Sequence, residues 1–175
     1  RRLDLELVRR GLAPSRTEAQ RLIADGVFSV SDIAHPNQTM RVDGSTVIKK
    51  IGALPRYVGR GGLKLEHALE EFSLSPAGLT VADIGASTGG FTDCLIQHGA
   101  KTVAAIDVGS GQLASRLRSH PRVSVFESCN VRRIDASEVG GPFELVVCDV
   151  SFISLVVIRS AIVRLGSSNA HWILL

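Results

Sequence analysis

The sequence predicts an α/β protein built on a doubly wound parallel sheet and preceded by a small α+β module. Residues 63–175 alternate short apolar runs with helix-like patterns, as in a parallel sheet with helices on both faces. One apolar run, 80–84, leads into a glycine-rich turn followed by a helical pattern, which is how such sheets build a cofactor pocket. Residues 1–66 carry twelve Lys and Arg against seven Asp and Glu, whereas the rest carries eight against ten. This asymmetry indicates two modules.

The composition bounds the class of protein. A chain of 175 residues with 45% hydrophobic residues can form one moderate domain or two small ones. No apolar run is long and charge-free enough to span a bilayer, and the start of the chain lacks a signal-peptide pattern. The three cysteines lie far apart, without the spacing of a metal site. We therefore expect a cytoplasmic protein with no membrane association, no metal and no disulfide, and nothing indicates its oligomeric state.

The basic module is expected over residues 1–50. An apolar helical pattern ends near Gly11, and Ser15 with Glu18 forms a capping box before a second helix over Arg16–Asp25. The expected short strands are 27–30, 41–42 and 46–48. Two short helices and a small sheet, with arginines on the helical face, are typical of a compact RNA-binding module that contacts phosphates.

This module resembles an S4 RNA-binding domain. The residues that carry the resemblance are Arg2-Leu3-Asp4, Leu7–Ala13, Ser15-Arg16, Ala19-Gln20, Leu22-Ile23 and Gly26. After Gly26 the pattern departs from the family, because Ser29–Asp32 stands where S4 domains have a Val-Asn-Gly turn. The resemblance and the positive charge together predict RNA contacts by Arg2, Arg9, Arg10, Arg16, Gln20, Arg21 and Arg60.

Glycines and Pro55 punctuate residues 51–62, which we expect to be a linker. A helix follows over Leu63–Phe72, with an apolar stripe of Leu65, Leu69 and Phe72. Lys64 lies in its first turn, where the helix dipole disfavours a cation, so it is either a functional residue or a solvated surface lysine.

The second module, residues 63–175, alternates strand and helix. The expected strands are 80–84, 102–107, 123–127, 145–149 and 172–175. The expected helices are 90–97, 112–119, 136–139 and 155–165. The sheet carries its ligands at the carboxyl ends of its strands, where the sequence places acids at 83, 107 and 149. Because an acid at the tip of a buried strand is costly without a partner or a function, Asp149 is a candidate functional residue.

The turn after the first of these strands separates two kinds of cofactor. A dinucleotide fingerprint needs glycine at three positions, which here hold Gly85, Ser87 and Gly90, so the middle glycine is missing. Asp83 suits a ligand with an ammonium group, such as S-adenosylmethionine, and Asp107 would accept hydrogen bonds from ribose hydroxyls. A glycine-rich turn that binds no ligand is the alternative.

Residues 56–175 are similar to FtsJ-like 2′-O-ribose methyltransferases, and with the S4-like front the chain resembles the TlyA family of rRNA cytidine-2′-O-methyltransferases, which are also named haemolysins. The blocks that carry this resemblance are Val58–Leu65, Asp83–Thr92, Asp107-Val108-Gly109 with Gly111-Gln112-Leu113, Asn130-Val131-Arg132 and Asp149–Leu155. It implies S-adenosylmethionine as cofactor and methylation of cytidines in 16S and 23S rRNA, with rRNA or ribosomal subunits as partners. The cofactor-binding residues that it implies are Asp83, Gly85, Ser87, Thr88, Gly89, Phe91, Asp107, Val108 and Asn130.

The family uses a Lys-Asp-Lys-Glu catalytic set, and Lys64 and Asp149 match its first two members. The second lysine and the glutamate would follow Leu175, so we expect the methyltransferase sheet to be incomplete at its C-terminal end, truncated after the fifth strand. Two other functions stay open at this point. The chain can be an RNA-binding protein with an inactive methyltransferase fold, or, as the haemolysin name suggests, a membrane-lytic protein.

Overall fold

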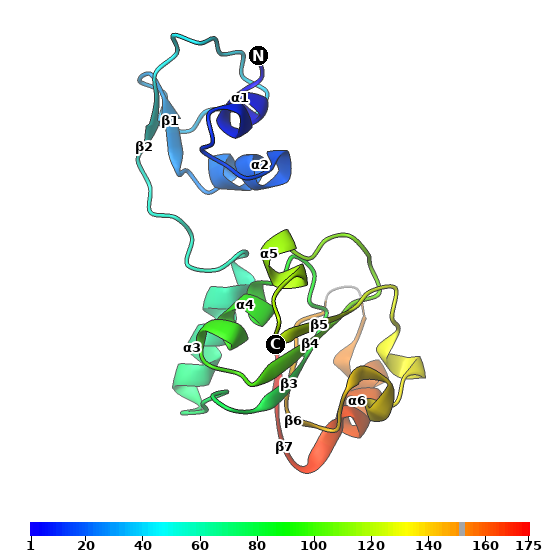
Figure 1. Cartoon of the computed structure of the whole chain (residues 1–175). Coiled ribbons are helices and arrows are strands. Elements are labelled where there is room, and N and C mark those ends of the chain that lie inside the picture. The colour runs from blue at the N-terminus through cyan, green and yellow to red at the C-terminus, as the bar shows by residue number, and fades with distance from the viewer. Residues whose placement is uncertain (151–152) are drawn as a thin grey trace. The chain divides into compact units, whose positions relative to one another are not determined.

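The computed structural model describes residues 1–150 and 153–175, and it divides into two compact units, Arg1–Pro55 and Arg56–Leu175. Figure 1 shows both units with their helices and strands labelled. Ser151 and Phe152, within the block Asp149–Leu155 singled out above, lie outside the described residues.

The first unit packs two helices on a two-stranded antiparallel sheet. Its elements are α1 (Leu3–Arg9), α2 (Arg16–Ala24), β1 (Phe28–Val30) and β2 (Ile48–Lys50). Ser15 caps α2 by accepting a hydrogen bond from the Glu18 backbone N–H, as the capping box predicts. The apolar residues of α1 and α2 pack on β1, with Leu3, Leu7 and Phe28 almost fully buried.

Two expected strands of this unit differ in the structure. The second strand of the sheet begins at Ile48 rather than ending there, and residues 41–42 form only an isolated bridge between Arg41 and Arg2. The hairpin-like turn before β2 uses Asp43 to accept hydrogen bonds from Ser45 and Thr46, which holds residues 43–46 in a turn instead of a strand.

The second unit is a five-stranded parallel sheet in the order β5-β4-β3-β6-β7. Its strands are β3 (Thr80–Ile84), β4 (Thr102–Ile106), β5 (Val123–Phe126), β6 (Phe143–Cys148) and β7 (Gly166–Leu174). The chain runs from β3 outward to β4 and β5 and then crosses to β6 on the other side of β3, so the switch point of the sheet lies between β3 and β6. In doubly wound sheets such a switch point is where ligands bind.

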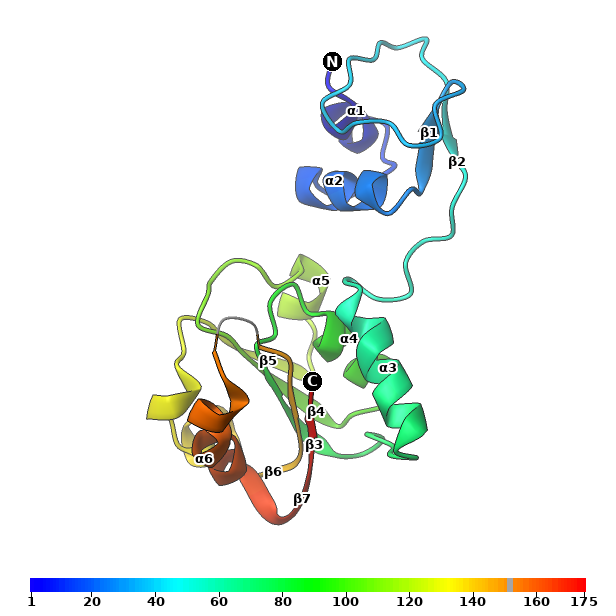
Figure 2. The same cartoon turned by 180° about the vertical axis from the view of Figure 1, so that it is seen from behind.

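Helices cover both faces of this sheet (Figures 1 and 2). The helices are α3 (Gly61–Glu71), α4 (Gly90–Gln97), α5 (Ser115–Arg118) and α6 (Leu155–Leu165), with short 3₁₀ turns η1 (Val131–Arg133) and η2 (Ala136–Val139). α3 and α4 bury Leu65 and Leu95 against one face, and α6 buries Ile158 and Ile162 against the other. Two apolar layers therefore hold β3 in the middle of the unit.

Several elements differ in extent from the sequence-based prediction. The segment expected as a linker ends earlier, because Tyr57 is almost fully buried in the core of the second unit. Phe72 is exposed, because α3 stops at Glu71 and Leu74 packs against the core instead. β7 begins at Gly166 rather than at Trp172.

The expected helix over 112–119 shrinks to the four residues of α5. Leu113 is buried beneath the turn that precedes α4, and the Ala114 backbone N–H donates to the Thr88 carbonyl at 3.1 Å. These contacts hold residues 113–114 outside the helix, so it starts only at Ser115.

Candidate active site

The carboxyl ends of three neighbouring strands meet at one edge of the sheet. Ile84 of β3 pairs with Ile106 of β4 and with Cys148 of β6. The residues that follow these strands therefore lie beside one another, as expected for parallel strands. This register brings Gly85, Asp107 and Asp149 to the same edge.

The turn between β3 and α4 depends on glycine at two positions. Gly85 has φ of +81°, and a Cβ there would lie 2.8 Å from the Asp149 carbonyl oxygen. Gly89, the N-cap of α4, has φ of +98°, and a Cβ there would lie 2.4 Å from Leu117 Cδ1. Both the left-handed backbone and the close approach of neighbouring atoms exclude a side chain. The glycines are thus required for the shape of the turn.

The replacement Gly89→Ala is expected to destabilise the second unit by roughly 2–4 kcal/mol, since it combines backbone strain with overpacking. Urea unfolding followed by circular dichroism measures the change. Gly111→Ala is a matched control, because Gly111 also has positive φ (+73°) but no atom lies within 4 Å of its added Cβ. Equal losses in the two variants would contradict the packing argument.

Asp83 is a buried carboxyl group at the end of β3. Its side chain is 1% exposed and accepts a hydrogen bond of 2.6 Å from the Thr92 hydroxyl of α4. Burial is the main reason why its pKa is raised to about 7, and the charges of Asp107 and Asp149 act in the same direction. An acid of this kind gains from a cationic ligand group, which would favour its charged form.

Asp107 organises the neighbouring turns. Its two carboxylate oxygens accept backbone hydrogen bonds of 2.7 Å each, Oδ2 from Ser87 and Oδ1 from Gly109. Ser87 itself has a positive φ of 49° and shares a side-chain hydrogen bond with Gln112. A half-buried carboxylate fixed in this way keeps further lone pairs for hydroxyl donors of a ligand.

Two cavities flank the end of β3, and both include Gly85. The first, of about 300 Å³, has walls of bare backbone and small side chains, and its lining is Gly59, Arg60, Gly61, Gly85, Ala86, Ser87, Thr88, Gly90, Phe91 and Asp149. The second, of about 310 Å³, is mostly apolar, and its lining is Ile84, Gly85, Ile106, Asp107, Val108, Cys129, Asn130, Val131, Val150, Ile153 and Ile158. Together they form a polar chamber and an apolar chamber on either side of one turn.

These chambers fit the parts of S-adenosylmethionine. Asp149 lines the polar chamber, and its carboxylate matches the positively charged methionyl part of the cofactor. Asp83 lines neither chamber but lies buried at the end of β3, next to Ile84 and Gly85, which line them. Asp107 lies at the lining of the apolar chamber, which has the chemistry for an adenosine group. The fit rests on the bare-backbone walls at Gly59, Gly61 and Gly85, since a side chain at any of them would meet an atom within 3.4 Å.

Lys64 and Asp149 form an ion pair at the polar chamber. Lys64 Nζ, from the first turn of α3, donates to Asp149 Oδ1 at 2.8 Å, and their side chains are 48% and 38% exposed. Asp149 also lines the polar chamber. The two residues chosen from the sequence as catalytic candidates, 85 positions apart, therefore touch each other beside the candidate cofactor pocket.

The structure also shows where the other expected cofactor residues lie. Thr88 and Phe91 line the polar chamber, Val108 and Asn130 line the apolar one, and Gly89 shapes the turn. Asn130 additionally caps η1 by accepting a hydrogen bond from the Arg132 backbone N–H. Arg60, expected to contact RNA, lines the polar chamber.

Several residues that line the two chambers were not predicted from the sequence as cofactor-binding residues. Gly59, Gly61, Val131, Val150 and Ile153 fell within the blocks of the family resemblance but were not assigned to the cofactor pocket, and Cys129 and Ile158 gave no signal distinct from core residues. The repeated glycines at the start of α3 were a further sign, because they place bare backbone beside Thr88 and Phe91.

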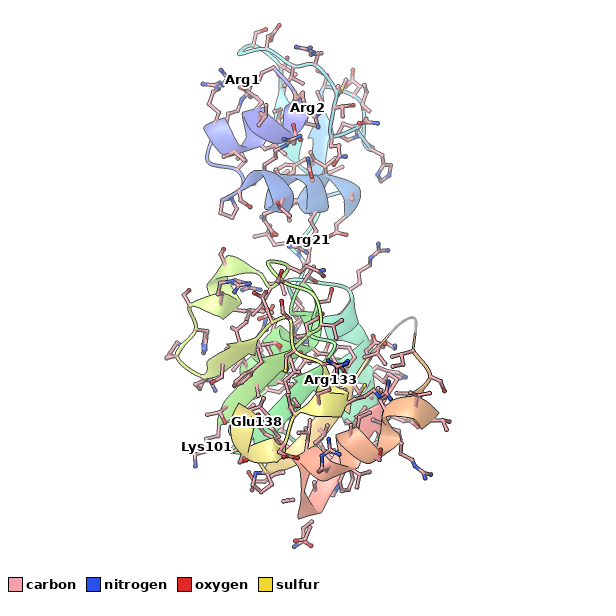
Figure 3. The ribbon with its side chains drawn as sticks, turned by 90° about the vertical axis from the view of Figure 1, so that its right-hand side faces the viewer. Arg1, Arg2, Arg21, Lys101, Arg133 and Glu138 are labelled. Atoms are coloured by element: carbon pink, nitrogen blue, oxygen red, sulfur yellow. The ribbon has the colours of Figure 1, made fainter. Side chains whose placement is uncertain are left out.

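The arginines expected to contact RNA are held by carboxylates of the first unit. Arg2, Arg16 and Gln20 donate to Asp4, while Arg9 and Arg10 donate to Glu6. Arg21 pairs with Glu18 and Asp25. Figure 3 labels Arg1, Arg2 and Arg21 on this unit. These side chains are thus fixed on the folded surface rather than free in solvent.

Within residues 1–150 and 153–175, no group of three or more His, Cys, Asp or Glu side chains has an arrangement that can hold a metal ion. In the same residues no helix is long and apolar enough to cross a membrane.

Comparisons with known proteins agree with the two-part organisation. Residues 57–170 match the model of the FtsJ-like methyltransferases, and residues 1–30 match that of the S4 domain. The 16S/23S rRNA (cytidine-2′-O)-methyltransferase TlyA of Mycobacterium tuberculosis is 44% identical over 97% of this chain and 63% of its own length. Hemolysin A of Brachyspira hyodysenteriae is 37% identical over 99% of this chain and 72% of its own length.

A solved structure from Streptococcus thermophilus that carries a hemolysin name has a TM-score of 0.71 and 37% identity. It covers 99% of this chain, and the match spans 64% of the other chain. The present chain spans 63% of the length of the M. tuberculosis relative.

Proposed function

The chain belongs to the FtsJ-like methyltransferase family, and we propose that it transfers a methyl group from S-adenosylmethionine to ribose 2′-oxygens of ribosomal RNA. The observation that carries this proposal is the Lys64–Asp149 ion pair beside the glycine-walled chamber. Cytidines of 16S and 23S rRNA are the proposed targets, following the name of the M. tuberculosis relative.

Each part of the candidate pocket has a proposed task toward the cofactor. S-adenosylmethionine, when bound, supplies a methyl group activated by its sulfonium. Asp83 would hold the ammonium group, Asp107 the ribose hydroxyls, and the apolar chamber the adenine. Gly85 and Gly89 keep the turn narrow enough for these groups to converge.

The catalytic pair would act on the 2′-hydroxyl of the target nucleotide. A hydroxyl is a poor nucleophile: as its oxygen takes the methyl group, the bond from that group to sulfur would break, a thioether would leave and the hydroxyl proton would pass to solvent, so negative charge develops on the oxygen. Lys64, held by Asp149, would place a positive charge near that oxygen and stabilise the charge. Alignment of the two reactants at contact distance would supply a further large part of the rate.

The first unit would hold the RNA. The first unit matches the S4 domain, and its candidate RNA-contacting arginines lie on α1 and α2 or at the ends of α1. Phosphate contacts of this kind give affinity that falls with salt and depends little on sequence. The proposed partners are therefore rRNA and ribosomal subunits, and the proposed location is the cytoplasm.

Methyl transfer from labelled S-adenosylmethionine to unmodified ribosomal subunits tests the proposal, using the protein as its gene encodes it. Label in RNA that resists alkaline cleavage at the modified position would support 2′-O-ribose methylation. Absence of label, with cofactor binding intact in calorimetry, would overturn the enzymatic proposal.

The same preparation separates the two alternatives. Tight RNA binding without methyl transfer would point to an RNA-binding protein with an inactive fold. Release of dye from liposomes at matched protein concentration would point to a lytic protein instead.

A further inference from the structure

Asp4 is a fully buried carboxylate on the face that carries the candidate RNA-binding residues. Its side chain is 0% exposed, although it belongs to the first turn of α1 in a small basic unit. Burial of a charge without partners would be very unfavourable, so its surroundings must supply compensating donors.

Four residues supply these donors from both helices. Oδ1 accepts hydrogen bonds from the Leu5 backbone N–H at 2.9 Å and from Arg2 Nε at 3.1 Å. Oδ2 accepts from Arg2 Nη2 at 2.9 Å, Arg16 Nε at 3.0 Å and Gln20 Nε2 at 2.7 Å. These contacts hold the pKa of Asp4 well below its usual range, with the Arg2 hydrogen bond as the largest cause, so the carboxylate stays charged at any working pH.

The two arginines keep part of their donor capacity. Among the described residues, Arg2 Nη1 and both Nη groups of Arg16 have no hydrogen-bond partner, and the side chains are 34% and 54% exposed. A guanidinium group is planar and its N–H groups point in fixed directions. The N–H groups that bind Asp4 therefore also fix the directions of the remaining N–H groups. Both arginines contact the same carboxylate oxygen, Oδ2, so Asp4 holds the two guanidinium groups close to each other.

We propose that Asp4 is the positioning residue of a phosphate-binding site whose ligating groups are Arg2 and Arg16. Two adjacent guanidinium forks match the non-bridging oxygens of a phosphodiester, and Arg binds such groups through paired hydrogen bonds. Without Asp4, two like charges at this spacing would repel each other and move apart. The ligand named here, an RNA backbone phosphate, rests on the proposed function.

Arg10 also donates to a buried carboxylate, but its remaining N–H groups bind the protein's own backbone. It donates to Glu6 at 2.8 Å, but its remaining groups donate to the backbone carbonyls of Thr46 at 3.0 Å and Asp43 at 2.9 Å. Arg10 therefore ties α1 to the turn before β2 and has little left for a ligand. Arg2 and Arg16 differ from Arg10 because some of their N–H groups have no partner among the described residues and can bind a ligand.

Asp4→Asn tests the positioning role through the sign of its effect on RNA affinity. A protein that binds RNA through net charge alone should bind more tightly when one negative charge is removed. A positioning carboxylate predicts the opposite, a loss of about tenfold or more in affinity for a labelled RNA duplex, with a shallower dependence on salt. Asp32→Asn is the control: it removes the same charge from an exposed position of the same unit, and should leave affinity unchanged or slightly increased.

A second variant keeps the test sharp if Asp4→Asn unfolds the first unit, as circular dichroism would reveal. Arg16→Lys preserves charge at a half-exposed position but removes the fork, so we expect a similar loss of affinity with an unchanged melting temperature. In the double variant Asp4→Asn/Arg16→Lys the two losses should not add, because both remove the same contact. Wild-type affinity in Arg16→Lys, or tighter binding in a folded Asp4→Asn, would overturn the proposal.

The outcomes separate this inference from the proposed function. Normal RNA binding by both variants of an active methyltransferase would overturn the phosphate site alone. Asp4-dependent RNA binding by a protein without methyl-transfer activity would support the site while the enzymatic proposal falls. A wild-type chain that binds no RNA would overturn both.

Discussion

Replacing Lys64 by alanine is expected to lower the methyl-transfer rate by roughly 10²–10⁴-fold, the range observed when a charged catalytic group is removed. The dissociation constant for S-adenosylmethionine should change little, because Lys64 contacts Asp149 but does not itself line the polar chamber. Single-turnover transfer of a labelled methyl group measures the first quantity, and calorimetric titration with S-adenosylmethionine measures the second.

Two further variants are needed to interpret this result: a control at an exposed lysine and a change in the partner of Lys64. Lys101→Ala removes the same charge from an exposed position at the start of β4, labelled in Figure 3, and should keep the wild-type rate. Asp149→Asn should lower the rate as Lys64→Ala does and also weaken cofactor binding, since Asp149 lines the polar chamber. Near-normal turnover in Lys64→Ala would show that the ion pair is structural.

Asp83→Asn is expected to weaken cofactor binding by at least about tenfold and, at the same time, to stabilise the free protein above pH 7. The pKa of Asp83 is raised to about 7 by burial, from an ordinary value of 3.8. Below about pH 4 the group is protonated in both folded and unfolded chains and costs nothing. Between about pH 4 and pH 7 the unfolded chain releases this proton while the folded chain keeps it, so the wild type loses stability over this range; above pH 7 the buried carboxyl is ionised too and the loss stays constant.

Asparagine is neutral at every pH and can still accept the Thr92 hydrogen bond. The free energy of unfolding should therefore be roughly 1–3 kcal/mol higher in the variant at pH 8, since one pKa unit corresponds to about 1.4 kcal/mol. The difference should shrink toward pH 4. Urea unfolding at both pH values measures it, and a variant less stable than wild type at pH 8 would contradict the explanation.

Asp93→Asn is the matched control for a buried acid with partners. Asp93 is 3% exposed and accepts hydrogen bonds from the Val58 backbone N–H at 2.8 Å, from Gln97 and from Arg116. Neutralising it leaves Arg116 without its counter-ion, so this variant should lose stability at pH 8. At pH 8, Asp83→Asn should therefore raise the free energy of unfolding and Asp93→Asn should lower it, although the two residues lie on neighbouring elements. This difference in sign is the clearest result that the two variants can give.

The sheet could be predicted from the sequence because its inner strands are apolar on both faces. β3 matches its predicted bounds, and β4 and β6 lie within two residues of theirs. β7 was predicted too short, because an edge strand does not require a continuous apolar run and its first half, Gly166–Asn169, is polar. α5 was predicted too long, because helix propensity does not reveal that Leu113 is drawn beneath Gly89.

Like the fold, the site could be predicted only where its residues carry a local sequence signal. Glycines and acids at strand ends carry a local signal, so Gly85, Asp107 and Asp149 could be placed from spacing alone. The apolar chamber could not, since its walls come from separate segments whose residues look like ordinary core. The buried state of Asp4 and Glu6 was also hidden, because acids on a short basic helix are usually solvated.

The close approach at Gly85 links the two halves of the site through sterics. Any larger residue there would press on the carbonyl of Asp149, the residue that holds Lys64. A single larger side chain at position 85 is therefore expected to disturb the turn after β3 and the Lys64–Asp149 ion pair together, so the two proposed halves of the site depend on one glycine.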